Sequence, residues 1–92
     1  MARCTIVIFH MPGCEACGEY LPRFARLAPR AQVPVHVLDA NAPQNQALAD
    51  RLGVTAVPCT FVLRQPHGIL RREGALSDDE IMWVLAVAAY YR

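Results

Sequence analysis

Two cysteines separated by two residues, Cys14 and Cys17, are the residues of this chain whose types and spacing could do chemistry. Two positions three apart at a helix start bring their sulfur atoms close enough for a disulfide bond. The unpaired amides and the dipole of a helix N-terminus lower a thiol pKa, so Cys14 can be a thiolate near neutral pH. A thiolate with a second thiol within reach can exchange disulfides, with Cys14 as the nucleophile and Cys17 as the resolving thiol.

Metal binding is the alternative chemistry that the two cysteines leave open. A single Cys-x-x-Cys supplies two ligands of a zinc or iron–sulfur site, and Cys59 or a second copy of the chain could add to them. No second Cys-x-x-Cys or Cys-x-x-His follows, so we favour redox chemistry with no bound metal or other cofactor. Cys59 is then either a small buried strand residue or a third thiol near Cys14, and Cys4 is a core or strand-end residue without a role.

A strand is predicted before the two cysteines and an amphipathic helix after them. Residues 4–10 contain the apolar run Ile6–Phe9 with no polar alternation, which is typical of a central parallel strand covered on both faces. Residues 15–29 place Cys17, Tyr20, Leu21, Phe24, Leu27 and Ala28 on one apolar stripe with helical spacing. Cys17 lies on the stripe and should be buried, whereas Cys14 precedes it and should be accessible.

The remaining chain alternates strands and helices without a linker. The patterns predict a strand at 33–39, a short helix that ends at Gly53, a strand from Val57 to Leu63, a turn at Pro66-His67-Gly68, a strand at 69–73 and a helix from Ser77 to the end. Ser77 and Glu80 have the spacing of a capping box. The sequence therefore predicts a single α/β domain over residues 1–92.

Charge and hydropathy exclude several classes of function. The net charge is +1, with nine basic and eight acidic side chains, which argues against nucleic acid or anionic membrane as the main partner. The apolar runs are too short for a signal peptide or a membrane span, so we expect a cytoplasmic, reducing location.

The last helix has no polar face over Ile81–Tyr91. Its second side either contacts a partner or a second copy, as in a homodimer, or is lined by alanines and binds nothing.

Three segments resemble the thioredoxin superfamily, and the resemblance covers nearly all of the chain. They are Phe9–Pro22, the Gly-Val-Thr-Ala-Val-Pro segment at 53–58, and the Gly-Ala-Leu-Ser segment at 74–77. A proline five residues after Cys17 is similar to the thioredoxin pattern, whereas Pro12-Gly13-Cys14 is similar to the glutaredoxin lead-in. The resemblance implies a minimal thioredoxin fold, βαβ-α-ββα, with a four-stranded mixed sheet and helices on both faces.

The resemblance also implies an activity and a substrate site. The expected enzyme is a protein-disulfide reductase that acts on disulfide-containing proteins and is recharged by a reductase or by glutathione. Pro58 would be cis, so that the Val57 backbone offers strand-like hydrogen bonds to an extended substrate segment, with Gly13 nearby. A glutaredoxin that acts on glutathione mixed disulfides is the alternative enzyme, although only Gly74 matches the Gly-Gly plus Asp pattern that holds glutathione.

Departures from the family pattern fall next to the two cysteines. The family's buried acid aligns with Ile8, so the usual proton acceptor for Cys17 is absent. The carboxylate of Glu15 disfavours a neighbouring thiolate, which predicts a reductant rather than a strong oxidant. His10 ends the first strand, where it either tunes Cys14 and shuttles a proton or is a plain boundary residue.

Overall fold

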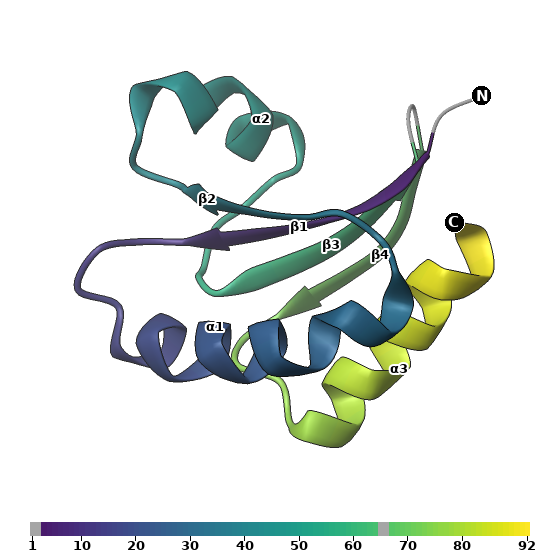
Figure 1. Cartoon of the computed structure of the whole chain (residues 1–92). Coiled ribbons are helices and arrows are strands. Elements are labelled where there is room, and N and C mark those ends of the chain that lie inside the picture. Colours follow the sequence, from purple (N-terminus) through teal and green to yellow (C-terminus); the bar gives the residue numbers. More distant parts are fainter. Residues whose placement is uncertain (1–2, 65–66) are drawn as a thin grey trace.

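Four strands form one mixed sheet in the computed structural model, which describes residues 3–64 and 67–92 (Figure 1). They are β1 (Cys4–His10), β2 (Val35–Asp39), β3 (Cys59–Arg64) and β4 (His67–Glu73), in the order β2-β1-β3-β4. β2 is parallel to β1, β3 is antiparallel to β1, and β4 is antiparallel to β3. The sheet predicted from the sequence is confirmed.

Helices cover both faces of the sheet (Figure 1). α1 (Glu15–Leu27) continues into a 3₁₀ turn (Ala28–Ala31) and lies with α3 (Asp78–Tyr91) on one face. A 3₁₀ turn (Pro43–Asn45) leads into α2 (Gln46–Arg51), which lies on the opposite face. Among the residues that the structure describes, no helix is both long enough and apolar enough to cross a bilayer.

β1 is the central element of the core, because its side chains alternate between the two faces. Ile6 and Ile8 point toward α1 and α3, and Val7 and Phe9 belong to the smaller cluster that packs on α2. All four are at most 6% exposed. The apolar run without polar alternation is thus explained by cover on both faces, as predicted.

Three predicted boundaries are corrected by the structure. The helix expected to reach residue 29 ends at Leu27, the strand expected from 33 begins at Val35, and the strand expected from Val57 begins at Cys59. The turn predicted at 66–68 is wrong for His67 and Gly68, which belong to β4, while Pro66 lies outside the described residues. Gly68 pairs with Leu63 beside a register shift in the ladder. Gly68 therefore lies at a bulge within β4 rather than in a turn before the strand.

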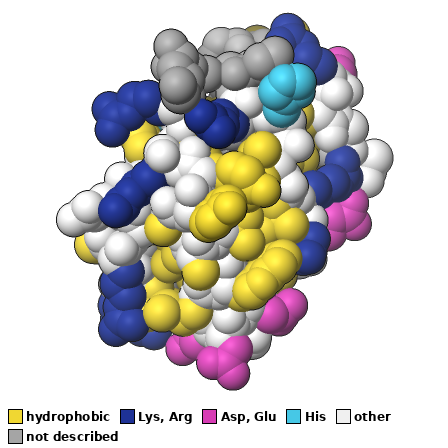
Figure 2. Space-filling model, turned by 90° about the vertical axis from the view of Figure 1, so that its right-hand side faces the viewer, with side chains coloured by type: hydrophobic (Ala, Val, Ile, Leu, Met, Phe, Trp, Pro, Cys, Tyr) yellow, Lys and Arg dark blue, Asp and Glu magenta, His cyan; other side chains and the backbone are white. Residues whose placement is uncertain are grey.

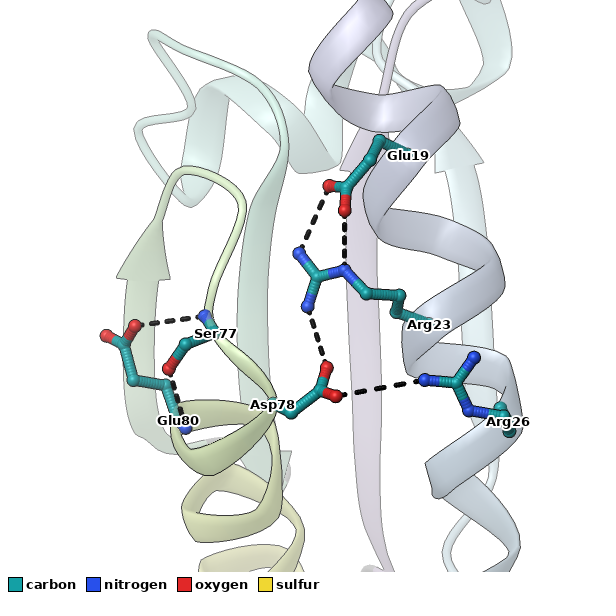
Figure 3. Close-up of polar contacts among 6 residues, drawn as sticks. All are labelled: Glu19, Arg23, Arg26, Ser77, Asp78 and Glu80. Carbon is teal, nitrogen blue, oxygen red and sulfur yellow. Dashed lines mark hydrogen bonds and ion pairs between the residues drawn. The ribbon is translucent and has the colours of Figure 1, made fainter.

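Two arginines of α1, Arg23 and Arg26, pair with Asp78 at the start of α3 (Figure 3). The Arg23 guanidinium donates to both carboxylate oxygens of Glu19, at 2.7 and 3.1 Å, and to Asp78 at 3.0 Å. Arg26 lies 3.8 Å from the other oxygen of Asp78. These contacts fix the direction of the helix that begins with the two cysteines.

α3 starts with the predicted capping box and leaves aromatic side chains in solvent. The Ser77 N–H donates to the Glu80 carboxylate at 3.0 Å, and the Glu80 N–H donates to Ser77 Oγ at 3.2 Å (Figure 3). Trp83 is 49% exposed beneath the Arg72 guanidinium, and Tyr90 is 82% exposed. Figure 2 faces the side of the molecule where both termini lie in Figure 1, and it shows apolar side chains gathered there. The contact with a partner or a second copy stays a prediction.

Candidate active site

The two cysteines close a disulfide at the junction between β1 and α1. Residues 11–13 turn the chain after His10, and the Cys14 N–H donates to the Met11 carbonyl at 3.2 Å. Gly13 has φ +79°, a conformation that is unfavourable for a residue with a Cβ, so a glycine fits this turn. Cys14 is the N-cap of α1, with its Cα 5.2 Å from that of Cys17. The local chain geometry thus sets the two sulfur atoms side by side.

The two sulfur atoms differ in exposure and in hydrogen bonding. Cys17 is 2% exposed, as its place on the apolar stripe predicts, whereas Cys14 is half-buried. The Cys17 N–H donates to Cys14 Sγ at 3.1 Å. A donor aimed at this sulfur, together with the positive end of the helix dipole, would favour the thiolate of Cys14 in the reduced protein. Glu15 is exposed beside it and opposes this effect.

A second segment reaches the same end of the sheet. Cys59 is opposite Phe9 in the ladder, so Pro58 comes at the level of His10, where β1 ends (Figure 1). The peptide bond between Val57 and Pro58 is cis, and the Gly74 N–H donates to the Pro58 carbonyl at 2.8 Å. Pro58 is buried and Val57 is half-buried. The segment that the resemblance assigns to the substrate therefore ends at the level of His10, just before the turn that leads to Cys14.

The two remaining cysteines are free, buried thiols. Cys59 lies with Phe9 and Phe61 in the cluster on α2, whereas α1 covers the other face of the sheet. Burial raises the pKa of the Cys59 thiol, although Arg71 works in the opposite direction, and burial likewise raises the pKa of Cys4. Both thiols therefore stay protonated at neutral pH. Within the described part of the chain, no group of three or more His, Cys, Asp or Glu side chains could hold a metal ion.

Two polar contacts near the site were missed from the sequence. Tyr20, counted only as part of an apolar stripe, shares a buried hydrogen bond of 2.8 Å with Thr60 of β3. Arg71, interpreted only as an edge-strand residue, donates to the carbonyls of Leu52 and Gly53. The sequence contains Tyr20 and Arg71, but it does not show which residues they contact. Thr60 is 40 residues from Tyr20, and Leu52 is 19 residues from Arg71.

Two grooves lie on the described surface near these elements. One of about 290 Å³ borders the turn after β1 and the segment before Pro58, with a lining of Met11, Ala40, Asn41, Gln46, Ala49, Asp50 and Val54–Val57. A larger groove of about 520 Å³ lies between α1 and the edge strand β2. Neither lining contains Cys14 or Cys17, but the smaller groove includes Met11, from the turn that leads to Cys14, and Val57, the residue before Pro58. We therefore assign the chemistry to the neighbourhood of the smaller groove.

Comparison with known proteins decides the family. The Thioredoxin family model matches residues 1–86. The chain belongs to the thioredoxin family. It is 40% identical over 55 residues to thioredoxin domain-containing protein 15 of Homo sapiens, a match that covers 60% of this chain and 15% of that protein. The Rattus norvegicus protein of the same name is 38% identical over 55 residues, covering 60% of this chain and 16% of that protein. The chain thus spans only a small part of the length of these relatives.

Solved thioredoxin structures confirm the predicted fold. The thioredoxin of Fasciola hepatica superposes with a TM-score of 0.81 at 22% identity, covering 99% of this chain and 83% of that chain. Thioredoxin F from spinach chloroplast, in its short form, gives a TM-score of 0.81 at 24% identity, covering 95% of this chain and 77% of that chain. Family membership together with the Cys14–Cys17 disulfide supports a thiol–disulfide oxidoreductase.

Proposed function

We propose that this protein reduces disulfide bonds in other proteins through the Cys14–Cys17 couple. The observation that carries the proposal is the unequal pair of sulfur atoms at the start of α1. Cys14 Sγ is half-buried and accepts a hydrogen bond from the Cys17 N–H, whereas Cys17 is only 2% exposed. A nucleophile must reach the substrate, and a resolving thiol needs only to reach the nucleophile.

The reaction proceeds by two exchanges. The Cys14 thiolate attacks one sulfur of the substrate disulfide; the substrate S–S bond breaks, and the departing substrate thiolate takes a proton from water. Cys17, after its proton has passed to solvent, attacks Cys14 Sγ; the mixed disulfide breaks, and the second substrate thiolate leaves. Two electrons have then moved from the protein dithiol to the substrate, and the Cys14–Cys17 disulfide is restored. A reductase or glutathione in a reducing, cytoplasmic location would recharge it.

The Val57 backbone is proposed to hold the substrate during attack. An extended substrate segment beside Val57 would form strand-like main-chain hydrogen bonds, which bind without demanding one particular sequence. The groove of about 290 Å³ next to Val54–Val57 would receive a flanking substrate side chain. Gly13 offers no side chain to obstruct this approach. Apart from its chain neighbours, no described residue lies within 4 Å of where its Cβ would be, so this position is open.

Insulin-disulfide reduction with dithiothreitol as the electron donor tests the proposal. Wild-type protein should accelerate the precipitation of insulin chains, and Cys14→Ser should reduce the rate to background. In a separate reaction without dithiothreitol, pre-reduced Cys17→Ser should accumulate a mixed disulfide with insulin, visible by mass spectrometry, because the second exchange is blocked. Cys4→Ala is the matched control, since it removes a buried thiol outside the couple and should retain the wild-type rate. Turnover by Cys14→Ser would refute the assignment of the nucleophile.

A reductant is expected rather than a strong oxidant, because the Glu15 carboxylate opposes the thiolate beside it. Thiolate absorbance of the reduced protein, titrated against pH, should give Glu15→Gln a lower Cys14 pKa than wild type. An unchanged or raised Cys14 pKa in Glu15→Gln would contradict this.

The glutaredoxin alternative is tested by reduction of a mixed disulfide of glutathione and hydroxyethanethiol. Faster turnover of that small disulfide than of insulin would favour it.

A further inference from the structure

The segment between α2 and β3, residues 52–58, is held by Arg71 of β4 at its start and by Gly74, the residue after β4, at its end. At its start, Arg71 Nη1 donates to the Leu52 carbonyl at 2.8 Å and Arg71 Nη2 donates to the Gly53 carbonyl at 3.0 Å. At its end, the Gly74 N–H donates to the Pro58 carbonyl at 2.8 Å. Contacts from β4 and from the residue after it thus hold the segment before and after residues 55–57, which border the same groove as Met11.

Arg71 is itself held in place by its neighbours. Its Nη2 atom lies 2.6 Å from the Glu73 carboxylate, and its guanidinium lies 5.5 Å from the centre of the Phe61 ring. Phe61 is also the residue opposite Arg71 in the β3–β4 ladder. A planar guanidinium that donates to two carbonyls and a carboxylate in fixed directions cannot be replaced by the single ammonium of lysine.

The middle of the segment has no such support. Thr55 and Ala56 are exposed and Val57 is half-buried. Within residues 3–64 and 67–92, the backbone N–H and C=O groups of Thr55, Ala56 and Val57 form no hydrogen bond. These groups are therefore available to a substrate strand, and their order depends on how the two ends of the segment are held.

We propose that Arg71 is a positioning residue for substrate binding, which holds the start of the 52–58 segment so that the Val57 backbone is already ordered when a protein substrate arrives. The inference rests on the proposed function of the Cys14–Cys17 couple. Without the two carbonyl contacts, the start of the segment would be held only by backbone bonds to α2, such as that from the Val54 N–H to the Ala49 carbonyl at 2.9 Å. A substrate would then have to restrict residues 55–57 further, and the lost backbone entropy would weaken binding. The exchange chemistry would be untouched, since it occurs on α1.

Arg71→Met and Arg72→Met form a matched pair that tests this. Methionine keeps an apolar stem over Phe61 but removes the donors, and Arg72 is an arginine of the same strand that lies over Trp83 instead. Pre-reduced protein is mixed with increasing insulin, and its oxidation is followed by acid quench and mass spectrometry. Arg71→Met should raise the half-saturating insulin concentration about tenfold with the limiting rate unchanged. Arg72→Met should match wild type.

A small aromatic disulfide separates positioning from general damage. It does not pair with the Val57 backbone, so Arg71→Met should oxidise with it at the wild-type rate. An equal loss of oxidation rate with both substrates would overturn the inference, and so would an unchanged half-saturating insulin concentration. If Arg71→Met fails to fold, Arg71→Lys is tested instead, because lysine keeps the charge and one contact. Arg71→Lys should raise the half-saturating insulin concentration by less than tenfold and leave the rate with the small disulfide unchanged. If wild-type protein does not reduce insulin at all, the proposed function fails rather than the role of Arg71.

Discussion

The buried hydrogen bond between Tyr20 and Thr60 yields the sharpest test of how α1 is held on the sheet. Tyr20 is 0% exposed and Thr60 is 1% exposed, and their hydroxyl oxygens lie 2.8 Å apart. The bond crosses from the helix that carries the cysteines to β3, two residues after Pro58. Removing one hydroxyl leaves the other buried without its partner, which costs about 1–3 kcal/mol.

The three variants Tyr20→Phe, Thr60→Val and the double substitution should behave non-additively. Tyr20→Phe keeps the ring and its edge contact with Phe24, whose centroid lies 5.8 Å away, and Thr60→Val keeps the branched shape. Each single variant should therefore lose about 1–3 kcal/mol through the orphaned hydroxyl alone. The double variant has no orphan and replaces both groups by apolar ones, so it should be at least as stable as either single variant.

Urea-induced unfolding of the oxidised protein, followed by circular dichroism, measures these differences. Thr60→Ser is the control, because it retains the hydroxyl and loses only a methyl group. The slope of free energy against urea must stay constant for the comparison to hold. If the double variant loses the sum of the two single losses, the hydroxyls are independent and the account of the bond is refuted.

Three further predictions follow from caps and buried thiols. Ser77→Ala removes the side-chain acceptor of the Glu80 N–H and should cost about 1 kcal/mol in urea unfolding; no loss would contradict the capping box. In the reduced native protein, iodoacetamide should modify Cys14 first and reach Cys4 and Cys59 only on unfolding, because burial raises the pKa of both thiols; peptide mass spectrometry would reveal early labelling of Cys59. Hydrogen bonds from Ser77 lower the pKa of Glu80 below its ordinary 4.5, so this stabilisation is present above that value and is lost as pH falls through the folded pKa. Glu80→Gln should flatten the acid limb of a melting-temperature profile.

Local patterns were enough to predict the elements that carry the cysteines. The apolar run in β1 and the stripe in α1 depend on residues that are neighbours along the chain, so strand, helix and the burial of Cys17 followed from spacing alone. The capping box at Ser77 and Glu80 was equally local. The arrangement of the strands, by contrast, was predicted through a resemblance, because pairing between distant segments leaves no mark on either segment alone.

Contacts that depend on register could not be predicted in the same way. Tyr20 and Thr60 are 40 residues apart, and Arg71 is 19 residues from Leu52. The first contact depends on the register of β3 beside β1, and the second depends on the register of β4 beside β3. A shift by one residue would turn Thr60 or Arg71 to the other face of the sheet. His67 shows the opposite error: a local pattern of proline, histidine and glycine predicts a turn, but pairing with Arg64 places His67 in the strand.

The absence of a buried acid changes how this site can respond to pH. Ile8, at the position of the family's acid, is 0% exposed and pairs with Thr60. Every aspartate and glutamate among the described residues lies outside the buried core, and the polar groups on this face are the hydroxyls of Tyr20 and Thr60. Burial raises the pKa of Tyr20, so this pair stays uncharged around neutral pH. We therefore expect that no buried carboxylate receives the proton that Cys17 loses during exchange, so this proton passes to solvent.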